Sequence, residues 1–188
     1  MKLVVATHNA GKLREISQML PEWDVAGEDS AAEETESTFS GNARIKARSV
    51  ALRNKGVWVL ADDSGLEVEA LDFAPGVRSA RYAGRDGDTK ANNALLLENL
   101  KGVENRRARF VCAMVLVSPG GEEHLFEGVC NGRIIDRQLG TEGFGYDPLF
   151  IPDGFDKTFA ELDSSVKNTV SHRAKALSAA KDFIVRSI

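Results

Sequence analysis

Short apolar segments that alternate with helix-period patterns are the feature that most constrains how this chain can fold. The first segment, Lys2–Ala6, contains Leu3-Val4-Val5, and apolar residues then recur at helical spacing until Pro21. A second helical pattern over residues 38–55 leads to a compact apolar segment at 57–61. Strands that alternate with helices predict an α/β fold with parallel strand pairing.

The rest of the chain adds both helices and a hairpin. Turn residues Pro119-Gly120-Gly121 separate two apolar or alternating segments, which predicts an antiparallel strand pair. Because crossovers and a hairpin both occur, we expect a mixed sheet. The elements expected after residue 61 are a half-exposed strand over 66–70, a helix over 89–100, strands over 109–117 and 124–133, a strand at 149–151 and a helix over 171–188. The acidic segment 28–36 and residues 72–87 are expected to be loops.

Composition narrows the class of protein. With 188 residues, 43% of them hydrophobic, the chain is expected to form a single domain over residues 1–188. Its net charge of -4 argues against a nucleic-acid groove binder, which usually carries a basic surplus. The N-terminal apolar run is too short for a signal peptide or a membrane span, and Cys112 and Cys130 lack metal-ligand spacing. We expect buried free thiols in a cytoplasmic protein that binds no membrane.

The first candidate site is the loop Thr7-His8-Asn9-Ala10-Gly11-Lys12, which leaves a strand and enters a helix. Free backbone N–H groups, the positive end of the helix and a lysine together suit a phosphate. The segment does not match a P-loop, because Ala6 replaces its first glycine and Leu13 replaces its Ser/Thr. A simple helix cap remains the alternative interpretation.

The adjacent carboxylates Asp62 and Asp63 follow the apolar segment 57–61 and form the second candidate site. Two neighbouring carboxylates repel each other and are usually tolerated where a cation compensates them. In a strand their side chains point to opposite faces, so we expect at most one of them to face a given ligand.

Two further candidates lie in the second half of the chain. The segment Gly143–Pro148 combines glycines, which allow close backbone approach, with aromatic side chains that can stack on a planar base. Ser171-His172-Arg173 opens the last expected helix, and Lys167 precedes it. Basic residues in the first turn of a helix are unfavourable for its dipole, so an anionic or accepting partner is expected there. A packed turn and ordinary surface residues are the alternatives.

These residues resemble the inosine/xanthosine triphosphate pyrophosphatase family, also called the HAM1-like family. The likeness spans essentially the whole chain, and its motifs occur in the family's order. They are Thr7–Lys12, Thr38-Phe39 through Asn42-Ala43 to Lys46-Ala47, Ala61–Leu66, Pro75-Gly76 with Ser79–Tyr82, Gly143–Asp147 and Ser171–Arg173. The resemblance implies an elongated α/β fold, with a mixed twisted sheet flanked by helices and two lobes around a central cleft. It also implies a homodimer and Mg²⁺-dependent hydrolysis of ITP, dITP and XTP to the monophosphate and pyrophosphate.

The resemblance also implies roles for individual residues. Asp63 is expected to be the catalytic carboxylate, either as the base that activates water or as a metal ligand, and Glu34 the second metal ligand, with its neighbour Glu33 as the alternative. The residues expected to bind substrate are Thr7, His8, Asn9, Ala10, Gly11, Lys12, Lys46, Ser64, Phe144, Gly145, Tyr146, Asp147, Lys167, His172 and Arg173.

Three other functions remain open at this level. A related Maf-type pyrophosphatase would act on other nucleotides, including pyrimidines, but Ser171-His172-Arg173 and the glycine–aromatic loop argue against it. A non-catalytic nucleotide-binding regulator would keep the fold and bind ITP without releasing pyrophosphate. A nucleic-acid binder fits the acidic balance of charge least well.

Overall fold

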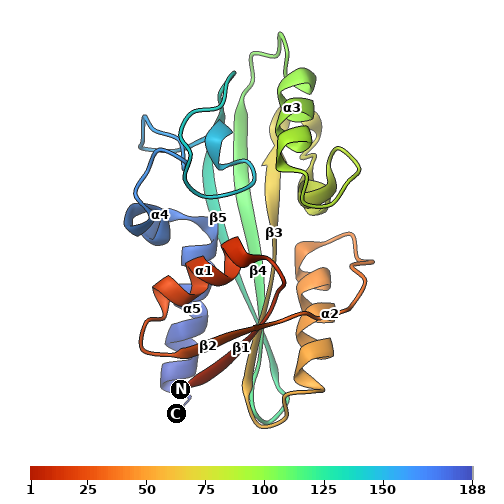
Figure 1. Ribbon diagram of the computed structural model, residues 1–188, viewed down its shortest axis with the longest axis vertical. Helices are drawn as coiled ribbons and strands as arrows, with labels where there is room; N and C mark the ends of the chain where they lie inside the picture. The colour runs from red at the N-terminus through yellow and green to blue at the C-terminus, as the bar shows by residue number, and fades with distance from the viewer. Residues whose placement is uncertain (188) are drawn as a thin grey trace. The chain divides into compact units, whose positions relative to one another are not determined.

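The computed structural model, which describes residues 1–187, contains a six-stranded sheet in the order β2-β1-β3-β4-β5-β6 (Figure 1). β1 pairs in parallel with β2 and β3, whereas β5 and β6 are antiparallel, so the sheet is mixed as expected. The strands are β1 (Lys2–Ala6), β2 (Asp24–Glu28), β3 (Trp58–Val68), β4 (Arg107–Val117), β5 (Glu123–Ile134) and β6 (Phe150–Pro152). The α-helices are α1 (Ala10–Met19), α2 (Phe39–Ala51), α3 (Thr89–Asn99), α4 (Ser164–Val170) and α5 (His172–Arg186), and the 3₁₀ helices are η1 (Glu69–Leu71), η2 (Gly76–Arg81) and η3 (Asp147–Leu149).

The chain forms two compact units, each built from segments that are distant in sequence. Unit 1 comprises residues 1–63, 112–128 and 173–187, and unit 2 comprises residues 64–111 and 129–172. The long strands β3, β4 and β5 contribute residues to both units. Asp63 and Ser64 therefore belong to different units, and so do His172 and Arg173.

Unit 1 has three layers, because alternate strand residues are buried on both faces of its part of the sheet. On one face Leu3 and Val5 pack in a cluster that includes Ile16 of α1 and Leu177 of α5. On the other face the cluster contains Val4 and Ala6 together with Ala43, Ala47 and Val50 of α2. Figure 1 shows α1 and α5 on the side of β1 opposite to α2.

Unit 2 has its own core, in which aromatic rings pack against the strands. Phe110 contacts Phe150 edge to face, with ring centroids 4.7 Å apart, and Phe159 packs against both rings. Leu96 and Leu100, from α3 and its C-terminal cap, belong to the same cluster. The core thus supports the segment over residues 143–149 that carries the glycine–aromatic motif.

The structure corrects several expected elements. β3 does not end before the two aspartates but continues through them to Val68, because both carboxylates are compensated by basic side chains. β2 and α4 were not expected, and α2 ends at Ala51 rather than at residue 55. The last expected helix is α5, and Ile188, assigned to it from sequence, lies outside the described residues. The buried free thiols of Cys112 and Cys130 are confirmed.

Across residues 1–187, no helix combines the length and the apolar character that spanning a membrane would require.

Candidate functional site

The two aspartates in the middle of β3 face different layers of unit 1. Asp63 approaches α2, where Asn42 and Lys46 lie one helical turn apart. Asp62 approaches the N-terminal part of α1 and the start of α5, where it meets Lys12 and Arg173. The alternation of side chains along a strand explains the division, and it confirms the expected opposite orientation of the pair.

Lys46 joins two carboxylates on the α2 face. Its ammonium donates to Glu34 Oε1 at 2.7 Å and lies 3.4 Å from Asp63 Oδ1. Asn42 Nδ2 donates to Asp63 Oδ2 at 3.2 Å and to the carbonyl oxygen of Glu36 at 3.1 Å, so it holds Asp63 and the 34–36 segment together. Glu33, the alternative to Glu34, is exposed.

Burial and the neighbouring charges oppose each other in this cluster. It raises the pKa of Asp63 above the ordinary range, although Lys46 and Lys12 oppose the shift. Burial also disfavours the charged form of Lys46, but Asp63, Asp62 and Glu34 outweigh it and raise the pKa of Lys46. Lys46 therefore remains a cation between two carboxylates, which marks this position as one that stabilises positive charge.

A second charged network lies on the other face of β3. Asp62 Oδ2 accepts from Arg173 Nε at 3.3 Å and Nη2 at 3.1 Å, and Lys12 Nζ lies 3.2 Å from the same oxygen. Arg173 Nη1 also donates to Glu15 Oε2 at 2.5 Å. Burial opposes ionisation of Asp62, but Lys12 and Arg173 prevail and lower its pKa below the ordinary range. The network thus contains two negative side chains, Asp62 and Glu15, and two positive ones, Lys12 and Arg173.

The loop before α1 presents backbone groups beside Lys12. Asn9 caps the helix, with its Oδ1 accepting from the backbone N–H of Lys12 at 3.1 Å. Thr7 Oγ1 accepts from the N–H of Asn9 at 3.1 Å, which fixes the preceding turn. His8 is exposed and lies 3.6 Å from Asp29. Ala10 and Gly11 form the first turn, where helix N–H groups have no intrahelical acceptor.

In unit 2, Asp147 organises the glycine–aromatic loop. Its Oδ2 accepts from the backbone N–H of Phe144 at 2.8 Å and from Lys167 Nζ at 2.5 Å. Gly143 has φ +75, and a Cβ there would overlap Asp147 Oδ2, so only glycine fits this turn. Lys167 also lies over the Phe144 ring, 5.0 Å from its centroid. The loop is therefore held from within by a buried ion pair.

The other predicted residues of unit 2 are anchored in its core. Tyr146 is buried, and its hydroxyl donates to the carbonyl oxygen of Ser79 at 2.8 Å. His172 is buried against Phe110, with nearly parallel rings whose centroids are 4.8 Å apart. Asn93 donates to the carbonyl oxygen of Gly145 at 3.2 Å. Phe144 and Ser64 are half-buried.

The predicted site residues are thus divided between the two units. Unit 1 holds Thr7, His8, Asn9, Ala10, Gly11, Lys12, Glu34, Lys46, Asp63 and Arg173, and unit 2 holds Ser64, Phe144, Gly145, Tyr146, Asp147, Lys167 and His172. Sequence reasoning missed Asn42 as a neighbour of Asp63, and Glu15 as a partner of Arg173. Their spacing along the sequence could have indicated both residues. Asn42 lies four residues before Lys46 and Glu15 lies three residues after Lys12, and side chains three or four residues apart share one face of a helix.

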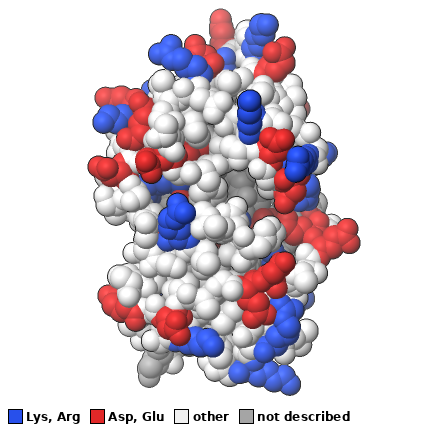
Figure 2. All heavy atoms as spheres, viewed as in Figure 1, with Lys and Arg blue, Asp and Glu red and all other residues white. Residues whose placement is uncertain are grey.

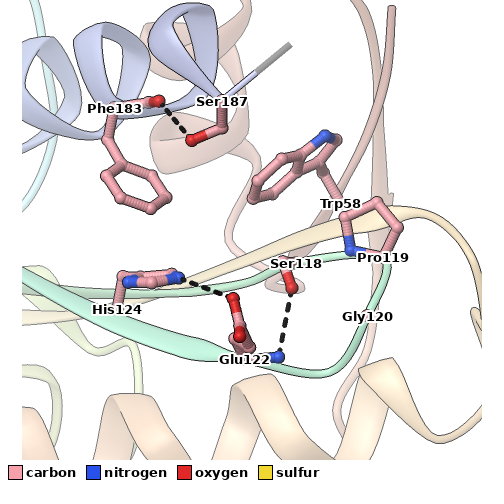
Figure 3. Close-up of a pocket in the computed structure, with 8 residues that line it drawn as sticks. All are labelled: Trp58, Ser118, Pro119, Gly120, Glu122, His124, Phe183 and Ser187. Atoms are coloured by element: carbon pink, nitrogen blue, oxygen red, sulfur yellow. Dashed lines mark hydrogen bonds and ion pairs between the residues drawn. The ribbon is translucent and has the colours of Figure 1, made fainter.

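Two further features of the surface bear on the function. A hollow of about 580 Å³ in unit 1, lined by Trp58, Ser118, Pro119, Gly120, Glu122, His124, Phe183 and Ser187, contains none of the predicted site residues (Figure 3). Basic and acidic side chains are interspersed over the face shown in Figure 2, with no continuous basic stripe on it.

Among residues 1–187, no group of three or more His, Cys, Asp or Glu side chains is placed to hold a metal ion.

Comparison with known proteins identifies the family. The Ham1 family model matches residues 3–183. A dITP/XTP pyrophosphatase of an Exiguobacterium species (strain ATCC BAA-1283 / AT1b) is 50% identical, covering 94% of this chain and 93% of the relative. The corresponding protein of Geobacter sulfurreducens is 48% identical over 97% and 96% of the two chains.

Solved structures agree with this assignment. The Staphylococcus aureus Ham1 protein superposes with a TM-score of 0.86 at 39% identity, covering all of both chains. The nucleoside-triphosphatase (dITP/XTP pyrophosphatase) of Mycobacterium abscessus gives a TM-score of 0.74 at 45% identity, covering 96% of this chain and 98% of the other. With a family match across nearly its whole length, the chain belongs to the Ham1 family.

Proposed function

We propose that this chain hydrolyses the non-canonical purine nucleotides ITP, dITP and XTP to the monophosphate and pyrophosphate, and so removes them before they enter DNA or RNA. The observation that carries the proposal is the convergence of Glu34, Lys46 and Asp63 in unit 1, in a chain about half identical to dITP/XTP pyrophosphatases. Residues 1–188 would act as one catalytic domain, since a single family model matches residues 3–183.

The metal in this proposal is Mg²⁺, held by Glu34 and Asp63. The two carboxylates already share one cation, the Lys46 ammonium, so they can serve a second positive centre in the same place. Carboxylate oxygens suit Mg²⁺, which commonly takes one or two of them together with substrate phosphates. Bound there, Mg²⁺ would supply positive charge for the phosphate oxygens. The exposure of Glu33 supports Glu34 as the ligand.

In the proposed reaction a water oxygen forms a bond to the α-phosphorus. The bond from that phosphorus to the α–β bridging oxygen breaks, and pyrophosphate leaves with this oxygen. Asp63 either accepts the proton of the attacking water or holds the metal. Lys46, Lys12 and the N–H groups at the start of α1 stabilise the negative charge of the phosphates.

We assign the choice of base to the loop residues Phe144–Asp147 with Ser64, Lys167, His172 and Arg173. Hypoxanthine and xanthine carry a 6-oxo group where adenine carries an amine, so a donor at that edge favours the non-canonical bases. Guanine shares the oxo group, and its rejection requires a clash or an unpaired donor at the 2-amino group. Comparable turnover of ATP and ITP would contradict this assignment.

The test of the function is pyrophosphate release with Mg²⁺ from ITP, XTP, dITP, GTP, ATP and dTTP. We expect a strong preference for the first three. Preference for dTTP would favour a Maf-type pyrophosphatase instead. ITP binding without pyrophosphate release by the folded protein would favour a non-catalytic regulator.

The resemblance also supports a homodimer, and the two buried free thiols fit a reducing compartment such as the cytoplasm. Light scattering coupled to size-exclusion chromatography would give the mass of the particle, for which we expect twice that of one chain. A monomer that is fully active would remove the dimer from the proposal.

A further inference from the structure

The adjacent aspartates of β3 have different surroundings, and only Asp63 has a role in the proposed function. Asp62 is completely buried, with an exposed side-chain fraction of 0%. A buried carboxylate is costly unless it is paired and hydrogen-bonded. The side chains that pair with Asp62 therefore indicate its role.

Those partners come from the two helices on its face of the sheet. Lys12, in the first turn of α1, lies 3.2 Å from Asp62 Oδ2, and Arg173, in the first turn of α5, donates to the same oxygen through Nε and Nη2. Glu15 binds the far side of the Arg173 guanidinium. Because Glu15 lies one helical turn after Lys12, the α1 helix is tied to this network at two points.

The contacts of the two aspartates indicate that they have different roles. Asp63 is joined to Glu34 through Lys46, whereas Asp62 is engaged by two cations on the opposite face of the strand. The guanidinium of Arg173 is likewise committed to two carboxylates and is 1% exposed.

We propose that Asp62 is a positioning residue, which holds the Lys12 ammonium beside the phosphate-binding loop and is itself fixed by Arg173. This inference rests on the proposed function, since it assigns Lys12 to the triphosphate. Arg173 also donates to Glu15, so the arginine links Asp62 to the α1 helix that carries Lys12. The pairing restricts a long flexible lysine side chain before the nucleotide arrives, which lowers the entropic cost of binding.

A double-mutant cycle tests the inference on binding alone. The probe is the α,β-imido analogue of ITP with Mg²⁺, titrated calorimetrically into the unsubstituted chain, Asp62→Asn, Lys12→Met and the double variant. We expect each single substitution to raise Kd about tenfold or more, and the double variant to bind no more weakly than Lys12→Met. A merely structural role for Asp62 would make the two effects additive.

The controls separate folding from positioning. Glu123→Gln removes a carboxylate that also pairs with two arginines of unit 1 and is expected to leave Kd unchanged. Asp62→Asn leaves Arg173 with less compensation. If this variant does not fold, all four proteins of the cycle carry Arg173→Gln, so any loss of a base contact of Arg173 is common to them. Circular dichroism establishes that each variant is folded.

The outcomes distinguish this inference from the function on which it rests. No binding of the analogue by the unsubstituted chain would refute the proposed function. Normal binding by that chain, combined with additive substitutions or with an Asp62 variant of unchanged Kd, would refute only the positioning role.

Discussion

At the scale of single residues, the same amino acid takes a different role on each face of a strand. Asp62 and Asp63 are neighbours in sequence, yet one meets Arg173 and Lys12 and the other Lys46 and Asn42. The sequence pattern predicted the opposite orientation, because it depends only on strand geometry. It did not predict the partners, since Arg173 lies 111 residues from Asp62 along the chain.

Asp63→Asn should abolish turnover and leave the fold intact. The substitution keeps the shape of the side chain but removes the charge that a proton acceptor or a metal ligand requires, so we expect kcat to fall at least about 100-fold. Pyrophosphate release measures the loss, and circular dichroism checks the fold. Glu127→Gln, an exposed change on β5, is the control with unchanged kcat. Near-normal activity of Asp63→Asn would refute the assignment.

The thiols should be unreactive in the folded protein. Burial raises the pKa of Cys112 to about 12, and the nearby Asp62 carboxylate adds to the shift, so almost no thiolate exists near neutral pH. Cys130 is also buried. We expect no reaction with a thiol reagent such as DTNB at pH 8 in buffer, and reaction of both cysteines in concentrated urea. Rapid labelling of Cys112 without denaturant would show that the strand opens.

At the scale of elements, the sequence predicted most of the helices and strands and missed those that tertiary contacts create. α3 and β4 match their apolar patterns within two residues. The missed strand β2 has the sequence Asp-Val-Ala-Gly-Glu, which is poor in β-branched residues, and its parallel pairing with β1 specifies it instead. The continuity of β3 was missed because polar residues in its middle resemble a turn until their charged partners are known.

The connection between α2 and β5 should depend on pH. Glu123 accepts from Arg48 at 2.5 Å and 3.1 Å and from Arg44 at 3.1 Å. Hydrogen bonds from Arg48 are the main cause that lowers the pKa of Glu123 below its ordinary 4.5. A carboxyl group whose pKa is lower in the folded than in the unfolded protein stabilises the fold at pH values above its unfolded pKa. This stabilisation is lost as the pH falls through its folded pKa.

Glu123→Gln should therefore lower the free energy of unfolding by up to about 1 kcal/mol at pH 7, and by less as the pH falls below 4.5. Thermal melts of both proteins at several pH values measure the difference, with Glu127→Gln as the matched change on the same strand. A difference that grows on acidification would have the wrong sign for an ion pair.

At the scale of the whole molecule, each unit has its own core but neither is a continuous stretch of chain. Unit 1 draws its apolar residues from β1, α1, β3, β4 and α5. The sequence patterns predicted an α/β fold with a mixed sheet, as did the family resemblance, and both features are confirmed. The roles of the individual site residues stay predictions, because they depend on a bound nucleotide and metal.

α5 should carry a large share of the stability of unit 1. Leu177 is buried among residues that include Leu3 and Val5, so Leu177→Ala should lower the free energy of unfolding by about 2–5 kcal/mol. Val185→Ala, on the same helix but 60% exposed, is the control and should change it by less than about 0.5 kcal/mol. Urea denaturation measures both. Equal effects would mean that α5 is only loosely packed.

The discontinuous composition of unit 1 also has a consequence for biosynthesis. A ribosome makes β1, α1 and β3 early, together with the buried acids Glu15 and Asp62, but it makes Arg173 only after all of unit 2 has been translated. Until then the nascent chain lacks both the arginine that neutralises these acids and the helix that covers Leu3 and Val5. Domains generally fold as complete units during synthesis. Unit 1 therefore gains its core and its charged network only after α5 has left the ribosome.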